Sequence, residues 1–126
     1  MKSPHTGITR ILHAARFSWK GFRSTWKHEA AFRQEVVLLI LLTPAAFWLG
    51  ENAVDVALLM GVWLFVLVVE LLNTAVETVV DRIGSEYHKL SGRAKDQGSA
   101  AVFVAFSVAI LVWLGYAYHK WQSLYG

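Results

Sequence analysis

The chain has 126 residues, which is the size of one domain and too short for several. Apolar residues make up 56% and charged residues only 17%, so the composition excludes an ordinary soluble domain. The absence of cysteine excludes disulfides, cysteine–metal sites and a thiol nucleophile. Three apolar blocks predict an all-α integral membrane protein, and we expect residues 1–126 to form a single membrane domain.

The first segment, about residues 5–28, is predicted to be an amphipathic helix on the membrane surface. Its apolar residues recur with helical spacing and include two tryptophans: Ile8, Ile11, Leu12, Ala15, Trp19, Phe22 and Trp26. The opposite face is basic: Arg10, His13, Arg16, Lys20, Arg23 and Lys27. A helix with this distribution lies in the plane of the interface. The alternative, a soluble helix packed on a core, fails because the chain offers no soluble core.

The first predicted transmembrane helix covers about residues 30–49. Val36 to Leu49 gives only fourteen apolar residues, fewer than the roughly 20 that usually cross a bilayer. Residues 30–32 extend it if Arg33 reaches the interface or faces protein. Pro44 is expected to kink this helix. The short connection after it predicts an antiparallel hairpin with the next span.

The second and third spans are predicted at about residues 53–82 and 98–118, with a loop at 83–97 between them. Gly98 to Tyr118 carries no charge over twenty-one residues and is the clearest span. Aromatic side chains gather at its far end: Trp113, Tyr116, Tyr118 and Trp121. Small residues at 98–101 allow another helix to approach closely.

The placement of basic residues predicts the orientation. Seven Lys and Arg residues precede Gln34, four lie between Arg82 and Lys95, and one lies near the end of the chain. By the positive-inside rule the N-terminus and the loop at 83–97 are cytoplasmic and the C-terminus is periplasmic. The basic charge indicates affinity for lipid headgroups and phosphates, and we expect no nucleic-acid partner because a bilayer covers the same face.

A polar stripe marks the end of the second span. On a helix, Glu70, Asn73, Glu77 and Asp81 fall within an arc of about 80°. With Val56 at the membrane edge, Glu70 lies about 21 Å along the helix, still inside a hydrocarbon core of about 30 Å. An ionisable residue at that depth indicates a functional site. The alternative is an acid that anchors a helix end or pairs with a base for packing.

The acidic stripe, Glu29 and the basic loop converge on the cytoplasmic interface. Carboxylates beside phosphate-seeking bases are what magnesium-dependent phosphoryl transfer requires, because Mg²⁺ takes oxygen ligands from one or two carboxylates and substrate phosphates. Nucleotide-binding and protein-kinase motifs are absent. The five histidines show no paired ligand spacing. From the residues alone, the chain is therefore a membrane protein with an interfacial acid-and-base site.

A longer motif identifies a resemblance. It reads Glu70-x-x-Asn73-Thr74-Ala75-x-Glu77-x-x-Val80-Asp81, then Arg82-Ile83-Gly84-Ser85-Glu86-Tyr87-His88-x-Leu90-Ser91-Gly92-Arg93-Ala94-Lys95-Asp96. Upstream it continues through Gly7-x-Thr9-Arg10, Ser18-Trp19-Lys20-Gly21 and Glu29-Ala30-Ala31-Phe32-Arg33-Gln34-Glu35. Over nearly the whole chain, the sequence resembles the small integral membrane diacylglycerol kinases of bacteria.

The resemblance implies transfer of the ATP γ-phosphate to the free hydroxyl of diacylglycerol, at the cytoplasmic face of the inner membrane. It also implies a homotrimer with active sites between neighbouring chains. Glu70 matches the proton acceptor and Asn73 the amide that supports it, while Glu29 and Glu77 match the Mg²⁺-binding acids. The alternatives are an undecaprenol kinase of the same family and a non-catalytic membrane scaffold.

Further positions match by resemblance. Those around ATP are Arg10, Phe17, Glu29, Glu77, Glu86, Tyr87, His88, Lys95 and Asp96. Those around the lipid are Ala14, Ala15, Ser18, Trp19, Arg23, Trp26, Ala31, Arg33, Gln34, Glu35, Trp48, Glu70, Ser99 and Trp113. The chain departs from the enteric form at Arg16, Phe17 and His28, where that form has Gly, Tyr and Asn. Phe17 removes a hydroxyl that could touch the nucleotide, and Arg16 adds a large cation to the lipid path.

Overall fold

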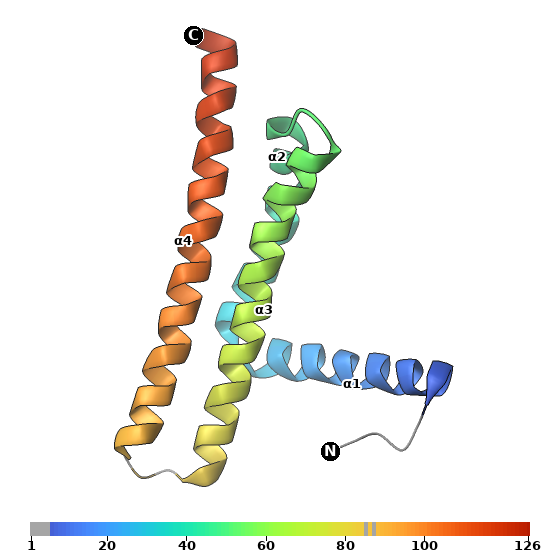
Figure 1. Ribbon diagram of the computed structural model, residues 1–126, viewed down its shortest axis with the longest axis vertical. Helices are drawn as coiled ribbons and strands as arrows, with labels where there is room; N and C mark the ends of the chain where they lie inside the picture. The colour runs from blue at the N-terminus through green and yellow to red at the C-terminus, as the bar shows by residue number, and fades with distance from the viewer. Residues whose placement is uncertain (1–5, 85, 87) are drawn as a thin grey trace.

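The computed structural model describes residues 6–84, 86 and 88–126, and these residues form four α-helices (Figure 1). The helices are α1 (Gly7–His28), α2 (Ala30–Leu49), α3 (Ala53–Ile83) and α4 (Lys89–Tyr125). Three of them, α2, α3 and α4, are long and apolar enough to cross a membrane. The predicted all-α class with three candidate spans is confirmed.

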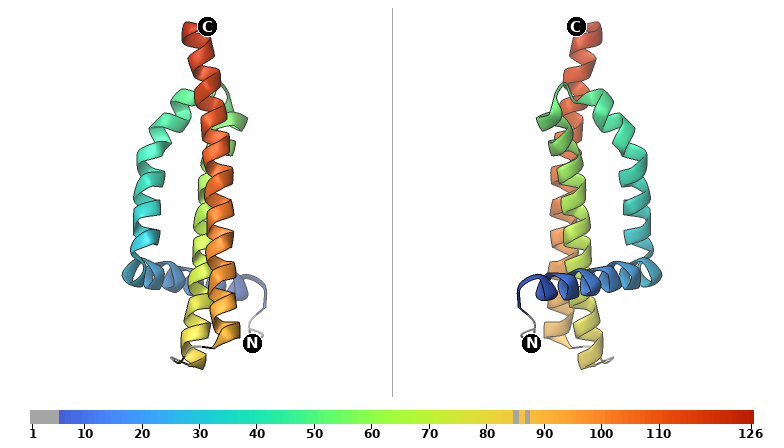
Figure 2. Two further views of the ribbon diagram at one scale, coloured as in Figure 1. Left: turned by 90° about the vertical axis from the view of Figure 1, so that its left-hand side faces the viewer. Right: turned by 90° about the vertical axis from the view of Figure 1, so that its right-hand side faces the viewer.

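Helix α1 extends sideways from the other three helices (Figures 1 and 2). It ends at Glu29, whose extended backbone, with φ −119° and ψ 107°, turns the chain into α2. The side chain of Arg33 fixes this corner, because its Nη1 donates to the carbonyl oxygens of Trp26 at 2.6 Å and Lys27 at 3.2 Å. Apolar residues such as Ile8, 76% exposed, lie uncovered on α1. The position of this helix on the membrane surface stays a prediction.

Helices α3 and α4 run side by side along most of their length (Figures 1 and 2). Alanines on α4 make this possible, since Ala105 and Ala109 are buried against Trp63 and Val66 of α3. A second apolar cluster, nearer the C-terminal end of the bundle, joins α2 to α3 through Ala46, Leu49 and Leu59. In a bilayer, close van der Waals packing of these side chains, rather than their removal from water, holds α2 and α4 against α3.

Helix α2 bends toward α3 and α4 at its end (Figure 2), and Leu39 and Leu42 in its middle pack against the cluster around Trp63 and Val66. Pro44 lies inside this helix. Proline lacks a backbone N–H and crowds the preceding turn, which bends a helix. The expected kink is consistent with this bend.

Helix α4 begins nine residues earlier than the predicted span, so most of the segment 83–97 is helical and its assignment as a loop was wrong. Only residues 84–88 connect α3 to α4. His88 begins α4, and its Nδ1 accepts a hydrogen bond from the backbone N–H of Leu90 at 3.1 Å. Polar residues predict where a helix leaves the bilayer, but they do not predict where it ends.

The C-terminal end of the bundle, defined here by residues 48–55 and 113–120, is held by polar contacts. Asn52 accepts from the N–H of Asp55 at 2.9 Å and begins α3, and Asp55 accepts from the hydroxyl of Tyr116 at 2.8 Å. His119 lies 2.9 Å from the carboxylate of Glu51. These contacts join the turn between α2 and α3 to α4.

Candidate active site

Two buried carboxyl groups face each other where α2 contacts α3. Glu70 of α3 is 6% exposed and Glu35 of α2 is 5% exposed. Their side chains lie within hydrogen-bonding reach of each other. The indole N–H of Trp63 donates to the backbone carbonyl of Glu35 at 2.9 Å, which fixes the position of α2 against α3 at this level. The sequence reading placed Glu70 inside the bundle but did not place Glu35 against it.

Two further acids lie close enough to Glu70 for their charges to act on it. These are Glu29, at the corner between α1 and α2, and Glu77, two turns along α3. Both are partly buried. Glu29 and Glu77, which the sequence predicted as metal ligands, therefore lie within electrostatic range of Glu70, which is the most buried of the three.

Asn73 connects to another member of the polar stripe on α3 through a hydrogen bond. Its Nδ2 donates to Oε1 of Glu77 at 3.2 Å, one helical turn away on α3. Its Oδ1 is buried, accepts no hydrogen bond, and points at Gly98 of α4. The sequence indicated that small residues at 98–101 allow a close helix approach, and the structure shows that Asn73 is the group approached.

The described part of the chain contains no cluster of three or more His, Asp or Glu side chains that could hold a metal ion. The donor set nevertheless suits Mg²⁺, which is usually bound by one or two carboxylates together with substrate phosphates. Glu29 and Glu77 are the two carboxylates that would hold it, and this role stays a prediction. The hydrogen bond from Asn73 engages one oxygen of Glu77 and leaves the other for a ligand.

A small polar cavity of about 280 Å³ lies where α3 meets α4, at the end of the polar stripe, and Asp81 of the stripe lines it. Glu86, His88 and Lys95, all predicted around the nucleotide, line it. Lys95 also donates to Asp81 at 2.8 Å in an exposed ion pair. Asp96 follows on the exposed surface of α4, and Tyr87 lies outside the described residues.

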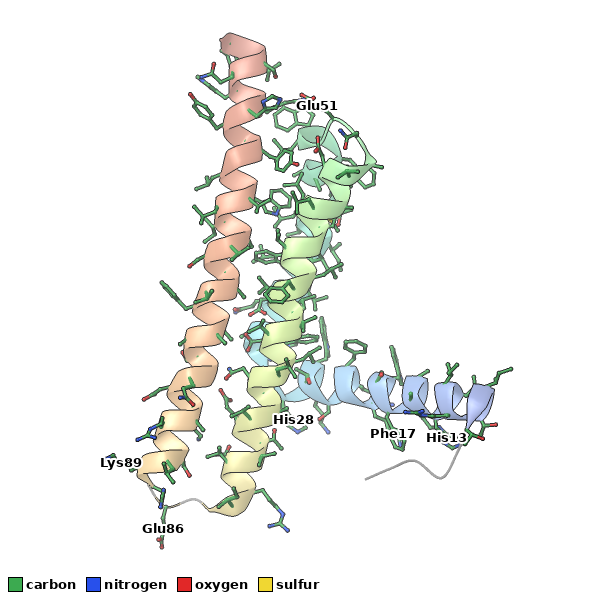
Figure 3. All side chains as sticks on the ribbon, in the orientation of Figure 1. His13, Phe17, His28, Glu51, Glu86 and Lys89 are labelled. Carbon is green, nitrogen blue, oxygen red and sulfur yellow. The ribbon has the colours of Figure 1, made fainter. Side chains whose placement is uncertain are left out.

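The other two predicted nucleotide residues lie elsewhere. Arg10 and Phe17 are on α1, and Phe17 is 63% exposed. In Figure 3, Phe17 lies on the lower side of α1, well apart from Glu86 and Lys89. One chain therefore does not bring the two predicted parts of the nucleotide site together.

An apolar cavity of about 380 Å³ opens between α1, α2 and α3. Its lining includes three predicted lipid contacts together with apolar residues of the spans: Trp19, Phe22, Arg23, Trp26, Phe32, Val36 and Leu67. It lies on the same segments of α2 and α3 as Glu35 and Glu70. An acyl chain fits such a lining, because nearly every side chain there is apolar.

The remaining predicted lipid contacts are dispersed. Exposed residues of α1, α2 and α4 are Ala14, Ala15, Ser18, Ala31, Gln34 and Ser99. Trp48 and Trp113 lie at the C-terminal end, where Lys120 lies 5.0 Å from the ring of Trp48 and Trp113 donates to the carbonyl of Leu59 at 3.0 Å. Leu59 is about 16 Å along α3 from Glu70, so one chain does not bring these two tryptophans to the acidic site.

The sequence comparisons agree with this geometry. The family model described as prokaryotic diacylglycerol kinase matches residues 16–116. The chain belongs to this family. It is therefore a bacterial membrane protein and a lipid kinase, as the motif predicted.

Three relatives show how far the similarity extends. The diacylglycerol kinase of Escherichia coli K12 is 55% identical over 113 residues, which cover 90% of this chain and 93% of the relative. That of Haemophilus influenzae is 50% identical and covers 87% and 93% of the two chains. That of Helicobacter pylori 26695 is 35% identical and covers 85% and 84%. The family match over residues 16–116 therefore spans the acidic site, both cavities, α2, α3 and most of α4.

Proposed function

We propose that the chain transfers the γ-phosphate of ATP to the free hydroxyl of diacylglycerol, at the cytoplasmic face of the bacterial inner membrane. The relatives named diacylglycerol kinase support this substrate. Glu70 carries the proposal, because it is buried at membrane depth beside an apolar cavity and within the field of three other acids.

Glu70 is the proton acceptor in this proposal. The acyl chains lie toward the apolar cavity lined by Trp19, Trp26 and Phe32, and the glycerol hydroxyl points to the Glu70 carboxylate. Glu70 takes the hydroxyl proton as the oxygen attacks the γ-phosphorus, the bond from that phosphorus to the β–γ bridging oxygen breaks, and ADP leaves. The helices exclude bulk water from this point, which strengthens the electrostatic interactions there.

Glu29 and Glu77 would hold Mg²⁺, which when bound supplies positive charge against the phosphates of ATP. The amide of Asn73 orients the Glu77 carboxylate for this task. The polar cavity lined by Glu86, His88 and Lys95 lies beyond these acids and suits the nucleotide. Positive charge from Lys95 favours the phosphates.

A homotrimer would complete the site. Arg10 and Phe17 lie on the part of α1 that extends from the bundle, apart from the polar cavity of the same chain. A neighbouring copy would bring its own α1 to that cavity. The cytoplasmic N-terminus and periplasmic C-terminus follow from the basic residues near α1 and at the start of α4.

The test is phosphate transfer by the purified chain in mixed micelles. With γ-labelled ATP and Mg²⁺, we expect label on diacylglycerol in preference to undecaprenol. A preference for undecaprenol would assign the polyprenol as substrate, and label on neither lipid would favour a non-catalytic scaffold. Glu51→Gln, assayed beside the unchanged chain, is the control variant. It removes an acid at the C-terminal end, remote from Glu70, and should leave the transfer unchanged.

A further inference from the structure

Gly98 of α4 occupies the closest approach between α4 and the acidic stripe. A Cβ atom built on Gly98 would overlap Oδ1 of Asn73 and would lie 3.2 Å from its Cγ. The amide oxygen therefore fills the space that the side chain of any other residue would need. Other glycines inside helices differ, since a Cβ on Gly61 of α3 or Gly115 of α4 would meet nothing within 4 Å.

Asn73 has no polar contact that holds its oxygen in this place. Its Nδ2 donates to Glu77, but its buried Oδ1 accepts no hydrogen bond. A buried oxygen without a donor gains nothing from its position, so packing must hold the amide. The backbone of α4 at Gly98 is the surface against which it packs.

We propose that Gly98 is a positioning residue for Asn73: the missing side chain lets α4 enclose the amide oxygen, which directs the amide NH₂ to Glu77. This inference rests on the proposed function, because it concerns how the Glu77 carboxylate is oriented. It adds a residue that touches neither lipid nor nucleotide in that proposal.

Gly98→Ala should move the amide and leave the helices in place. The overlapped atom is at the free end of the Asn73 side chain, which rotates more easily than two packed helices separate. Glycine-to-alanine inside a helix otherwise favours folding slightly. We therefore expect a thermal midpoint close to that of the unchanged chain, together with a displaced Asn73 amide.

Nitrogen-15 NMR of the full chain in detergent micelles detects a displaced Asn73 side-chain amide directly, without metal or substrate. The sequence contains two asparagines, Asn52 and Asn73, so ¹⁵N-asparagine labelling gives two side-chain amide signals. Gly98→Ala should shift the Asn73 signal and leave the Asn52 signal, which belongs to the cap of α3. Gly61→Ala is the matched control and should shift neither. An unmoved Asn73 signal in Gly98→Ala would overturn the proposal.

Kinetics provide the second readout. Displacing a group that orients the site should lower kcat at least about tenfold and raise the Mg²⁺ requirement, while the KM for diacylglycerol stays the same. In the Asn73→Ala background the obstruction is gone, so adding Gly98→Ala should lower neither kcat nor the thermal midpoint. An additional loss there would show that Gly98 serves packing alone. Failure of this inference can be told from failure of the proposed function. In the second case the unchanged chain itself would not phosphorylate diacylglycerol.

Discussion

The two ends of the bundle treat polar groups in opposite ways. At the C-terminal end, the Asp55 carboxylate accepts hydrogen bonds from Tyr116 and from the backbone N–H of Glu51, the backbone N–H of Asp55 donates to Asn52, and Glu51 lies against His119. At the acidic site, Oε1 of Glu35, Oδ1 of Asn73 and Oγ1 of Thr74 are buried without a hydrogen-bond partner. These three are the buried side-chain polar atoms without a partner among the described residues.

The difference separates polar groups that stabilise the fold from polar groups that lower its stability. A buried polar atom without a partner costs roughly 1–3 kcal/mol. The concentration of such atoms around Glu70 agrees with the proposed function, in which this is the substrate site. The paired groups at the C-terminal end join α2, α3 and α4. Substitutions at the acidic site should therefore change the rate of phosphate transfer, and substitutions at the C-terminal end should change the thermal stability.

The largest expected effect is that of Glu70→Gln on turnover. Glutamine keeps the size of the side chain but cannot accept the hydroxyl proton, so kcat should fall about 10²–10⁴-fold. Nucleotide affinity, measured by equilibrium binding of ATP, should stay unchanged. Equal loss of nucleotide binding would assign Glu70 to the metal or the nucleotide instead.

Glu77→Gln and Glu29→Gln should have the next largest effects. Each removes a charge from the proposed metal site, and we expect the Mg²⁺ concentration for half-maximal rate to rise about 10–100-fold. Magnesium titration of the initial rate measures this. An unaltered Mg²⁺ dependence in either variant would contradict its role as a ligand.

Tyr116→Phe should lower stability with little effect on turnover. The substitution removes the hydroxyl that donates to Asp55 across α3 and α4. Thermal unfolding in micelles should show a lower midpoint, and kcat below the unfolding temperature should match the unchanged chain. A fall in kcat at full folding would mean that the two ends are coupled.

The smallest effect is expected for His119→Gln. Its contact with Glu51 is mostly exposed, and exposed ion pairs contribute little to stability. Both the thermal midpoint and kcat should stay within error of the unchanged chain. A clear loss of stability would show that this pair supports the turn between α2 and α3 more strongly than its exposure indicates.

Local pattern predicted most of the fold. The helical period placed Glu70, Asn73 and Glu77 on one face, and long apolar blocks predicted the three candidate spans. Helix ends were less predictable, because residues 89–97 are polar and still continue α4. Helix α4 therefore extends beyond the apolar segment that is predicted to cross the bilayer.

Contacts between distant segments could not be predicted from one sequence. Glu35 faces Glu70, and Gly98 encloses the amide of Asn73, only because of how α2 and α4 are rotated against α3. The small residues at 98–101 indicated a close approach but not its partner. The separation of Arg10 and Phe17 from the polar cavity likewise depends on the direction in which α1 leaves the bundle.

The corner between α1 and α2 consists of Glu29 alone, and this sets a strict limit on chain length there. Successive residues of a helix are rotated by about 100°, so one inserted or deleted residue in the last turn of α1 would turn its two faces about the axis. The tryptophans would then leave the apolar cavity. A single backbone position thus couples the orientation of the amphipathic helix to the placement of a carboxylate beside Glu70, and insertions tolerated in ordinary surface connections would disable both together.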